Sequence, residues 1–373
     1  MNILINTSNL SKGGGIQVAD AICCNLFSYN QHFFYVVLNS GMDNTYDRIK
    51  NYPNVKCFHY SFPAKDWKSL LWGRNAFLDG IVNDYSIDCV LSVFGPITWC
   101  PRCPHICGYA IPHLVIPESP YFKRLKLNDW FHIKLWIWFN ILKFKRGTKY
   151  LYTENPFISH RVKQMIPDSE VRTITNTYNQ VFDTPSVQRF RQLPHFDGTT
   201  ILTVSAAYPH KNLEIAEDIL VLWKERYPDE KIRFVYTIES SELPLRNPNI
   251  KENILTIGRV DIAEVPSLYE QCNIVMQPSL LECFSAVYVE AMRTKRPLVV
   301  PDLAFAKGIC GKAALYYDAT SASDAVEKIH MVISDKNISR QLIGEGAKKL
   351  CSFDTSLSRT KKIIAFCEEV ASC

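Results

Sequence analysis

The sequence lacks three features that would place it in a broad class at once. It has no run of about 18 uncharged apolar residues, so no segment is expected to span a bilayer as a helix. The first residues, Met1 to Asn6, show no basic region followed by an apolar one, so we expect no secretory signal. The positive surplus is only 5, from 42 Lys plus Arg against 37 Asp plus Glu, which argues against nucleic acid as a partner.

Metal-binding patterns are also weak in this sequence. Of its 13 cysteines, Cys100 and Cys103 form a C-x-x-C pair close to His105 and Cys107, but there is no second such pair. Structural zinc sites usually take their ligands from two spaced pairs. We therefore expect no metal, no cofactor, and reduced thiols in a cytoplasmic protein.

Apolar runs alternate with helical patterns along the chain, in two separate series. In the first half, strands are expected at 3–5, 32–38, 88–93 and 104–109, with a helix at 16–26. In the second half, the expected strands are 200–204, 231–238, 254–257, 273–276 and 297–300, and the expected helices are 212–227, 263–272 and 286–293. This alternation predicts the α/β class, with two units that each contain a parallel sheet covered on both faces.

The seam between the two units is expected within 179–199, where prolines and a glycine interrupt a polar stretch. We divide the chain into an N-terminal domain, 1–182, a C-terminal domain, 183–345, and a last helical segment, 346–373. The helical pattern that ends the sequence starts near Asn337 and could belong to either unit.

Two loops of the first half contain residues suited to binding. Gly13, Gly14 and Gly15 separate the first strand from the first helix. Glycines let a backbone approach a ligand closely, and a helix start offers free N–H groups to an anion. The run matches neither the G-x-G-x-x-G nor the P-loop pattern, so a plain strand–helix turn remains an alternative. His113 follows a buried strand in a loop bracketed by prolines, where either a functional or a structural histidine would fit.

A lysine stands before a helix in the second half. The segment Pro209-His210-Lys211-Asn212 follows the strand at 200–204, and ligands of doubly wound sheets bind beyond the carboxyl ends of strands. The helix dipole disfavours a lysine at this end unless an anion is bound nearby. A solvated helix N-terminus is the alternative.

Two glutamates eight residues apart form the next candidate. Glu282 is expected in a loop and Glu290 inside the following helix, with free N–H groups near Ser285 and Ala286. Carboxylates accept hydrogen bonds from sugar hydroxyls, and helix N-terminal amides suit phosphate. The alternative is a solvated face of the helix.

The stretch from Tyr121 to Tyr150 combines basic and large apolar residues. Its one acidic residue is Asp129, and its bases are Lys123, Arg124, Lys126, Lys134, Lys143, Lys145, Arg146 and Lys149. The apolar residues between them are Trp130, Phe131, Ile133, Leu135, Trp136, Ile137, Trp138, Phe139, Ile141, Leu142 and Phe144. This mixture is typical of a helix lying on an anionic membrane surface. The alternative is a core helix with a basic outer face.

In this order, the motifs resemble the retaining GT-B glycosyltransferases of family 4, the glycosyl transferases group 1. The resemblance is strongest over 199–330 and covers the segments Ile201–Ser205, Pro209–Leu213, Thr256–Gly258, Leu268–Tyr269, Glu282–Met292, Pro297–Val299 and Ala314–Asp318. The spacing of Glu282 and Glu290 matches the family's E-x7-E signature. The resemblance implies a GT-B fold of two Rossmann-like doubly wound domains facing a central cleft, with the last helix crossing back to the N-terminal domain.

The resemblance also implies roles for individual residues. Catalytic roles fall to His113, Glu282 and Lys211. The residues implied in donor binding are Gly14, Gly15, His210, Lys211, Gly258, Arg259, Glu282, Cys283, Phe284, Ser285, Ala286 and Glu290. Among these, Glu290 would hold the ribose hydroxyls and Glu282 the donor sugar.

The sequence departs from the family pattern at three places. The family often has an arginine a few residues before its lysine, where this chain has Ser205-Ala206-Ala207. Neutralisation of the donor diphosphate would then fall to Lys211, with His210 or Arg259. Ser285 stands where glycine is common, and Leu114 stands where an aspartate often follows the histidine.

The resemblance implies transfer of a sugar from a nucleotide-diphosphate donor, with retention and without a metal ion. The acceptor would be a membrane glycolipid, polyprenyl-linked or lipid-linked, or an oligosaccharide, in polysaccharide or lipopolysaccharide (O-antigen) biosynthesis. We expect a cytoplasmic protein, peripheral at the inner face of the cell membrane. A nucleotide-sugar epimerase on the same fold and a non-catalytic sugar-nucleotide-binding scaffold are the alternatives.

Overall fold

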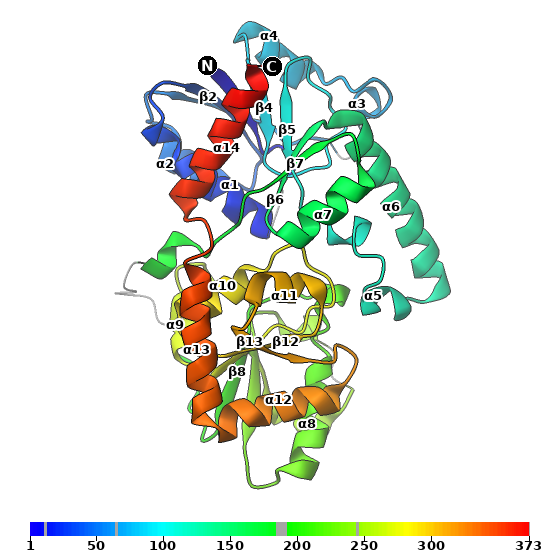
Figure 1. Cartoon of the computed structure of the whole chain (residues 1–373), viewed down its shortest axis with the longest axis vertical. Helices are drawn as coiled ribbons and strands as arrows, with labels where there is room; N and C mark the ends of the chain where they lie inside the picture. Colours follow the sequence, from blue (N-terminus) through cyan, green and yellow to red (C-terminus); the bar gives the residue numbers. More distant parts are fainter. Residues whose placement is uncertain (11–12, 64–65, 184–191, 244–245, 373) are drawn as a thin grey trace. The chain divides into compact units, whose positions relative to one another are not determined.

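A computed structural model of the chain describes residues 1–10, 13–63, 66–183, 192–243 and 246–372 (Figure 1). The part of the expected seam at 184–191 lies outside these residues. Contacts divide the chain into two units. The N-terminal unit consists of Met1–Pro117, Lys126–Asn176 and Asp354–Cys373, and the C-terminal unit consists of Glu118–Leu125 and Thr177–Phe353.

The N-terminal unit contains a seven-stranded sheet whose strand pairs are all parallel. Its order is β3-β2-β1-β4-β5-β6-β7. The strands are β1 (Asn2–Asn6), β2 (Phe33–Leu38), β3 (Val55–His59), β4 (Cys89–Ser92), β5 (His105–Gly108), β6 (Tyr150–Thr153) and β7 (Glu170–Thr173). Central β1 pairs on both sides, so that Ile3 lies opposite Phe34 on one neighbour and Cys89 on the other.

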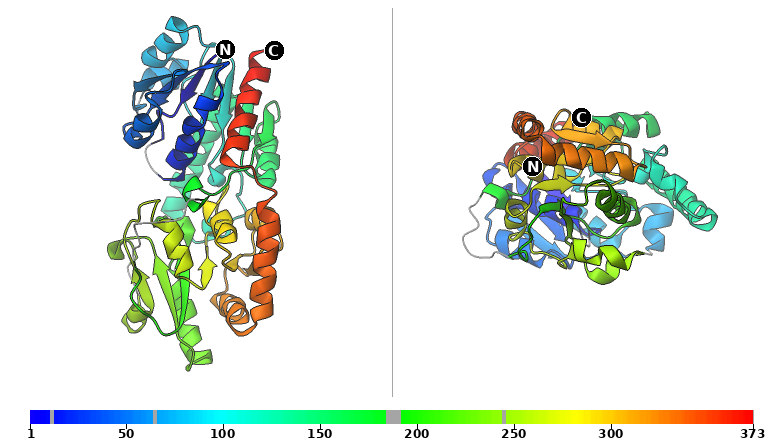
Figure 2. Two further views of the ribbon diagram at one scale, coloured as in Figure 1. Left: turned by 90° about the vertical axis from the view of Figure 1, so that its left-hand side faces the viewer. Right: turned by 90° about the horizontal axis from the view of Figure 1, so that it is seen from below.

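Apolar side chains of β1 pack in two hydrophobic cores, one on each face of this sheet. Ile3 and Ile5 lie in one core with residues of two helices, α1 (Gly14–Cys24) and α14 (Ser356–Ala371). Leu4 lies in the other core with residues of α4 (Ala76–Asp84). Because successive side chains of a strand point to opposite faces, a continuous apolar strand requires helices on both sides (Figure 2). The remaining helices of this unit are α2 (Asp43–Ile49), α3 (Trp67–Trp72), α6 (Leu127–Gly147) and α7 (Pro156–Met165).

The C-terminal unit contains a second parallel sheet, of six strands, in the order β10-β9-β8-β11-β12-β13. Its strands are β8 (Thr199–Thr203), β9 (Ile232–Tyr236), β10 (Ile254–Thr256), β11 (Ile274–Met276), β12 (Leu298–Pro301) and β13 (Ala314–Tyr317). Its helices are α5 (Pro120–Lys123), α8 (Ile215–Arg226), α9 (Val265–Glu270), α10 (Ala286–Arg293), α11 (Ala304–Cys310), α12 (Ala322–Ser334) and α13 (Lys336–Leu350). The two doubly wound Rossmann-like units expected from the alternating pattern are confirmed.

The single helix expected from Asn337 to the end of the chain is two helices, α13 and α14. The Thr355 side chain accepts the Ser358 N–H at the start of α14, and the Asp354 N–H donates to Thr175 Oγ1 at 2.8 Å. The chain passes from the C-terminal to the N-terminal unit at this break. A local helical pattern does not report such a break, because the tertiary hydrogen bond that accompanies it joins residues far apart in sequence.

The basic and aromatic stretch forms α5 and the 21-residue helix α6. Within α6, Asn140 and Phe144 are the buried residues, so the alternative of a core helix does not describe it. Its exposed large apolar side chains are Leu127, Trp130, Phe131, Leu135, Trp136, Trp138, Phe139 and Leu142. Among the residues that the structure describes, no helix has the length and hydropathy needed to cross a membrane.

Candidate functional site

A short turn beyond β8, which we call the lysine turn (209–212), places Lys211 over the carboxyl edge of the C-terminal sheet. Its last residue, Asn212, is buried with φ of 55°, in the left-handed region that asparagine tolerates. The side-chain amide nitrogen of Asn212 donates to the carbonyl of Pro278 at 3.4 Å. The turn is therefore fixed to the loop that follows β11.

Lys211 and Glu282 form an ion pair in which the ammonium group donates to the carboxylate. The loop of Glu282 follows β11, the strand next to β8, so the carboxyl ends of the two strands bring these residues together across the sheet edge. The Leu280 N–H also donates to the carbonyl of His210 at 2.8 Å. Both side chains of the pair are largely shielded from water, with 16% and 10% exposed, which strengthens their effect on a bound ligand.

Helix α10 begins beside this loop without a capping hydrogen bond to the side chain of its N-cap residue. Ser285 is buried at the N-cap, but its hydroxyl accepts no capping hydrogen bond. The first N–H groups of a helix have no partner within the helix, and the helix dipole favours an anion at this end. Cys283 is buried, and the ring of Phe284 packs edge-on against Phe353 at 6.0 Å. The backbone around Ser285 can therefore serve as an anion-binding group.

Glu290 lies further along α10, in a separate buried environment. Its carboxylate accepts a hydrogen bond of 2.7 Å from the hydroxyl of Tyr269 on α9. Burial raises the pKa of Glu290 to about 7, although the hydrogen bond from Tyr269 opposes this rise. Tyr269 belongs to a segment that resembles the family, but the sequence predicts no site role for it. Glu290 can accept hydrogen bonds from hydroxyl groups when it is ionised.

Gly258 and Arg259 follow the edge strand β10. Gly258 has φ of 72°, in the left-handed region that favours glycine, and a Cβ there would lie 2.8 Å from Oε1 of Glu239. Arg259 is exposed and makes no hydrogen bond or ion pair with the rest of the described chain. Because β9 lies between β10 and β8, two strand spacings, about 10 Å, separate these positions from the lysine turn across the sheet.

The remaining candidates belong to the N-terminal unit. Gly14 and Gly15 start α1 beyond β1, after Gly13 with φ of 78°, and a Cβ at Gly14 would meet no atom within 4 Å. The ring of His113 packs edge-on against Trp136 of α6 at 5.7 Å. Lys211, Glu282 and Glu290 all belong to the C-terminal unit.

The segment Glu118–Leu125 interrupts the N-terminal unit in sequence but packs within the C-terminal unit. The Ser119 hydroxyl caps α5 and donates to the carbonyl of Leu280 at 2.6 Å. The ring of Tyr121 is buried and lies edge-on to His210 at 6.1 Å. The domain boundaries set from the sequence do not anticipate this excursion, because no turn or composition signal marks it.

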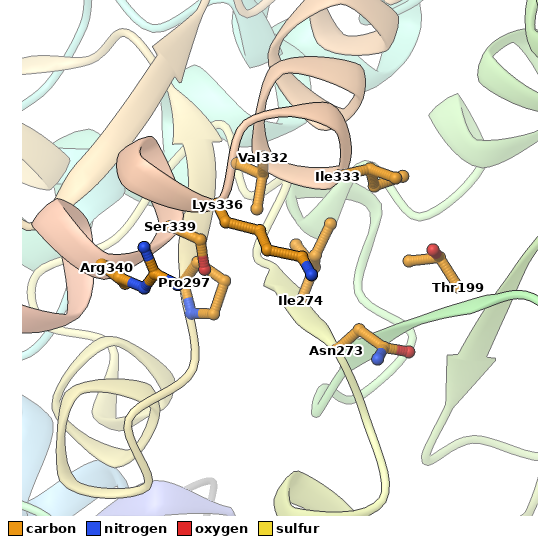
Figure 3. Close-up of a pocket in the computed structure, with 9 residues that line it drawn as sticks. All are labelled: Thr199, Asn273, Ile274, Pro297, Val332, Ile333, Lys336, Ser339 and Arg340. Atoms are coloured by element: carbon orange, nitrogen blue, oxygen red, sulfur yellow. The ribbon is translucent and has the colours of Figure 1, made fainter.

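A cavity of about 340 Å3 lies at the opposite edge of the C-terminal sheet (Figure 3). It is lined by Thr199, Asn273, Ile274, Pro297, Val332, Ile333, Lys336, Ser339 and Arg340. Thr199 begins β8, whereas Lys211 lies beyond the end of that strand. Since ligands of doubly wound sheets bind at the carboxyl ends of strands, this cavity is not the candidate active site.

Cysteines and other metal-ligating side chains do not cluster in the described part of the chain, where no three His, Cys, Asp or Glu residues are placed to share a metal. His105 is buried, and burial lowers its pKa to about 4. Its ring lies 2.9 Å from the Ser92 hydroxyl and 3.1 Å from the carbonyl of Gly147. These contacts give His105 a structural role.

Comparison with known sequences finds similarity over part of the chain. Residues 187–350 match the family Glycosyl transferases group 1. A further match is the O-antigen chain mannosyltransferase RfbU of Salmonella typhimurium, 25% identical over 185 residues, which cover 47% of this chain and 50% of RfbU. The match thus spans about half the length of that curated relative.

Solved structures agree with the fold over nearly the whole chain. A glycosyltransferase from Rickettsia africae has a TM-score of 0.70 at 12% identity and covers 99% of this chain and 98% of its own. A sucrose-phosphate synthase from Thermosynechococcus elongatus also has a TM-score of 0.70 at 12% identity, with 100% and 99% covered. Anabaena Alr3699/HepE in complex with UDP and glucose has a TM-score of 0.67 at 13% identity, and the match covers 99% of this chain and 100% of the HepE chain. The expected GT-B fold is confirmed.

Proposed function

Because the chain carries a Glycosyl transferases group 1 domain on a GT-B fold, we propose that it is a retaining glycosyltransferase that uses a nucleotide-diphosphate sugar. The observation that carries the proposal is the shielded Lys211–Glu282 pair beside the start of α10, which lacks a side-chain cap. A cation and backbone amides suit a diphosphate, and a carboxylate suits sugar hydroxyls. The relatives support this assignment, since HepE was solved with UDP and glucose.

The proposed reaction breaks the bond between the anomeric carbon and the diphosphate oxygen. The acceptor hydroxyl forms the new bond on the same face of the sugar, and its proton passes to the leaving diphosphate. Lys211 and the N–H groups around Phe284–Ala286 stabilise the negative charge that develops on the leaving group. Electrostatic stabilisation by groups held in place is usually the largest catalytic contribution. We propose that neither a metal ion nor a cofactor is required.

The remaining candidate residues are assigned to different parts of the sugar donor. Glu282 holds the sugar, Glu290 the ribose hydroxyls, and the backbone at Gly258 approaches the nucleoside. His113 acts on the reacting sugar, and Gly14 and Gly15, the first residues of α1, contribute to donor binding. His210, whose ring stacks on Tyr208 at 5.7 Å, lines the diphosphate side.

We assign the acceptor to the membrane, as a polyprenyl-linked or other lipid-linked saccharide. Helix α6 exposes eight large apolar side chains, and its polar positions include exposed bases such as Lys134 and Lys145. This composition fits a helix that lies on an anionic leaflet, which would hold the enzyme at the inner face of the cell membrane. The O-antigen role named for RfbU supports a place in polysaccharide or lipopolysaccharide biosynthesis.

A labelling experiment distinguishes this proposal from its alternatives. The protein is incubated with UDP-, GDP- and ADP-sugars labelled in the sugar, together with a bacterial lipid extract. A transferase moves label into the lipid fraction, and an epimerase converts the donor without labelling lipid. A binding scaffold does neither, and that outcome would refute the proposed enzyme activity. The configuration of the product's anomeric carbon, read by NMR, tests retention.

A further inference from the structure

Arg124 is a cation at the lysine turn that the motifs of the C-terminal half do not include. It ends α5, in the segment that packs within the C-terminal unit. Ser119 fixes this segment to the loop of Glu282, and Tyr121 fixes it to His210. The segment therefore carries a guanidinium group to the carboxyl edge of the C-terminal sheet.

The contacts of Arg124 attach it to the residue next to Lys211. One terminal nitrogen of its guanidinium group donates to Oδ1 of Asn212. The same nitrogen lies 3.6 Å from a carboxylate oxygen of Glu214, whose side chain is 52% exposed. Asn212 is itself buried and fixed, so Arg124 is held at a defined place on the turn.

Much of the guanidinium group is available for a ligand. The side chain is 39% exposed, and within the described residues its other terminal nitrogen and Nε have no hydrogen-bond partner. Burial raises the pKa of the Tyr317 hydroxyl, and the charge of Arg124 opposes that rise, so the guanidinium also acts near the end of β13. The hydroxyl of Tyr317 is buried without a partner among the residues described.

The charges at the lysine turn leave a bound diphosphate incompletely neutralised. A nucleotide-sugar diphosphate carries two negative charges, whereas the charge of Lys211 is already balanced by Glu282. Ser205, Ala206 and Ala207 bring no cation to the loop before the turn. The ion pair of Arg124 with exposed Glu214 is longer and better screened by water, so it yields more readily to a ligand.

We propose that Arg124 supplies the second positive charge that binds the donor diphosphate, from the segment Glu118–Leu125 rather than from the loop after β8. This inference rests on the proposed function. A guanidinium group can donate two parallel hydrogen bonds to phosphate oxygens, which makes it a more geometrically specific phosphate ligand than an ammonium group. The competing explanation is that Arg124 only fastens α5 to Asn212.

The test measures nucleotide affinity by calorimetry with UDP, GDP and ADP and with the matching monophosphates. Arg124→Ala is expected to weaken binding of the preferred diphosphate about tenfold to a hundredfold, and to weaken the monophosphate much less. Arg124→Gln removes the charge but keeps an amide that can donate to Asn212, so it should show the same loss. Arg124→Lys should recover part of the affinity for the diphosphate. The control is Lys123→Ala, which removes an adjacent exposed base and should change the affinity for neither the diphosphate nor the monophosphate.

The outcomes separate this inference from the proposed function. If Lys211→Ala loses diphosphate binding while Arg124→Gln retains it, the function stands and the role of Arg124 is refuted. Equal losses for diphosphate and monophosphate would show a structural role and also refute it. If the unaltered protein binds no nucleotide diphosphate, the proposed function itself fails, together with the inference.

Discussion

The two units use the same winding of the chain but place their functional chemistry differently. In both sheets the first strand is central, and the chain winds outward to one side before it crosses to the other: β1, β2, β3 then β4, and β8, β9, β10 then β11. The C-terminal unit buries the carboxylates of its candidate site, with Glu282 in the loop at the carboxyl edge and Glu290 within α10. The N-terminal unit instead turns large apolar side chains outward along α6.

This difference shows what each end of the proposed reaction requires. A leaving diphosphate is stabilised by charges and dipoles fixed in a poorly solvated site, so the C-terminal unit needs particular residues at particular positions. Binding of a helix to a membrane surface depends on its exposed apolar area and on its positive charge. In this proposal α6 therefore needs apolar and basic residues on its surface, but not at particular positions. One scaffold can therefore serve both purposes.

The largest effect is expected when the buried chemistry of the C-terminal unit is removed. Lys211→Ala or Glu282→Ala should lower the transfer rate roughly 10²-fold or more, because each removes a group fixed at the candidate site. The rate is measured with labelled donor and lipid acceptor. The control is Lys348→Ala, which breaks an exposed pair with Glu345 on α13 and should leave the rate unchanged. Unchanged rates in both site variants would contradict the assignment of this edge as the active site.

The next effect concerns the exposed chemistry of the N-terminal unit. Replacing Lys126, Lys134 and Lys145 by Glu should reduce binding to anionic vesicles at least about a hundredfold, since the loss of three bases alone removes about 3 kcal/mol and the three carboxylates add repulsion. Arg146 is left intact because its guanidinium group donates to the carbonyls of Leu70 and Leu71 on α3. Binding is measured by sedimentation with vesicles rich in phosphatidylglycerol.

Two controls sharpen the membrane prediction. Neutral phosphatidylcholine vesicles should bind the unaltered protein weakly, and raising the salt concentration should reduce binding to the anionic vesicles. The charge reversals Lys224→Glu, Lys336→Glu and Lys348→Glu, which fall on α8 and α13, should reduce binding less than the α6 reversals. Equal losses in the two triple variants would show that overall charge, not α6, determines binding.

A smaller, pH-dependent effect is expected from Glu290. Its raised pKa of about 7 means that the carboxylate is mostly protonated at pH 6 and mostly ionised at pH 8. If ribose hydroxyls donate to the ionised form, nucleotide affinity should rise about tenfold from pH 6 to pH 8. In calorimetric titrations, Glu290→Gln should remove this dependence, and a flat profile for the unaltered protein would contradict the ribose role.

The same group affects stability in the opposite direction. The folded protein holds the proton of Glu290 more tightly than the unfolded chain does. The contribution of Glu290 to the free energy of unfolding is therefore complete below about pH 4.5 and is lost as the pH rises through 7. The ligand-free protein should therefore lose thermal stability from this group between about pH 4.5 and 7, a range that overlaps the start of the rise in nucleotide affinity. Comparing melting temperatures of the unaltered protein and Glu290→Gln isolates the contribution of this group.

The sequence predicted four of the seven strands of the first sheet and five of the six of the second, because buried strands are local, continuous apolar runs such as 200–204. It did not predict β3, β6, β7 or β13. The family resemblance assigned Lys211 and Glu282 to one site, and the structure adds the reason why they meet, since the adjacent parallel strands β8 and β11 end at one edge. The sequence did not predict the excursion of Glu118–Leu125 or the pairing of Glu290 with Tyr269. The hydrogen bond of Ser119 to Leu280 spans 161 residues, and no local pattern reports such a contact.

The smallest effect concerns the N-terminal unit, where one side chain of α6 is proposed to serve both membrane binding and the action of His113. Trp136 and Trp138 are both exposed on α6, at 44% and 55%, but the ring of Trp136 also packs against His113. Trp136→Ala and Trp138→Ala should weaken vesicle binding to a similar extent. Because an aromatic contact contributes about 0.5–1.5 kcal/mol, Trp136→Ala alone should also slow transfer to a detergent-dispersed acceptor, roughly twofold to tenfold.

The detergent assay makes this comparison decisive, because the rate there does not depend on attachment to a bilayer. If His113 acts on the reacting sugar, Trp136→Ala lowers kcat and leaves the donor KM unchanged, since the lysine turn and Glu290 are untouched. Trp136→Phe, which keeps a ring beside His113, should restore most of kcat. If Trp136→Ala and Trp138→Ala instead behave alike in detergent, α6 serves the membrane alone, and the exposed chemistry of the N-terminal unit is separate from catalysis.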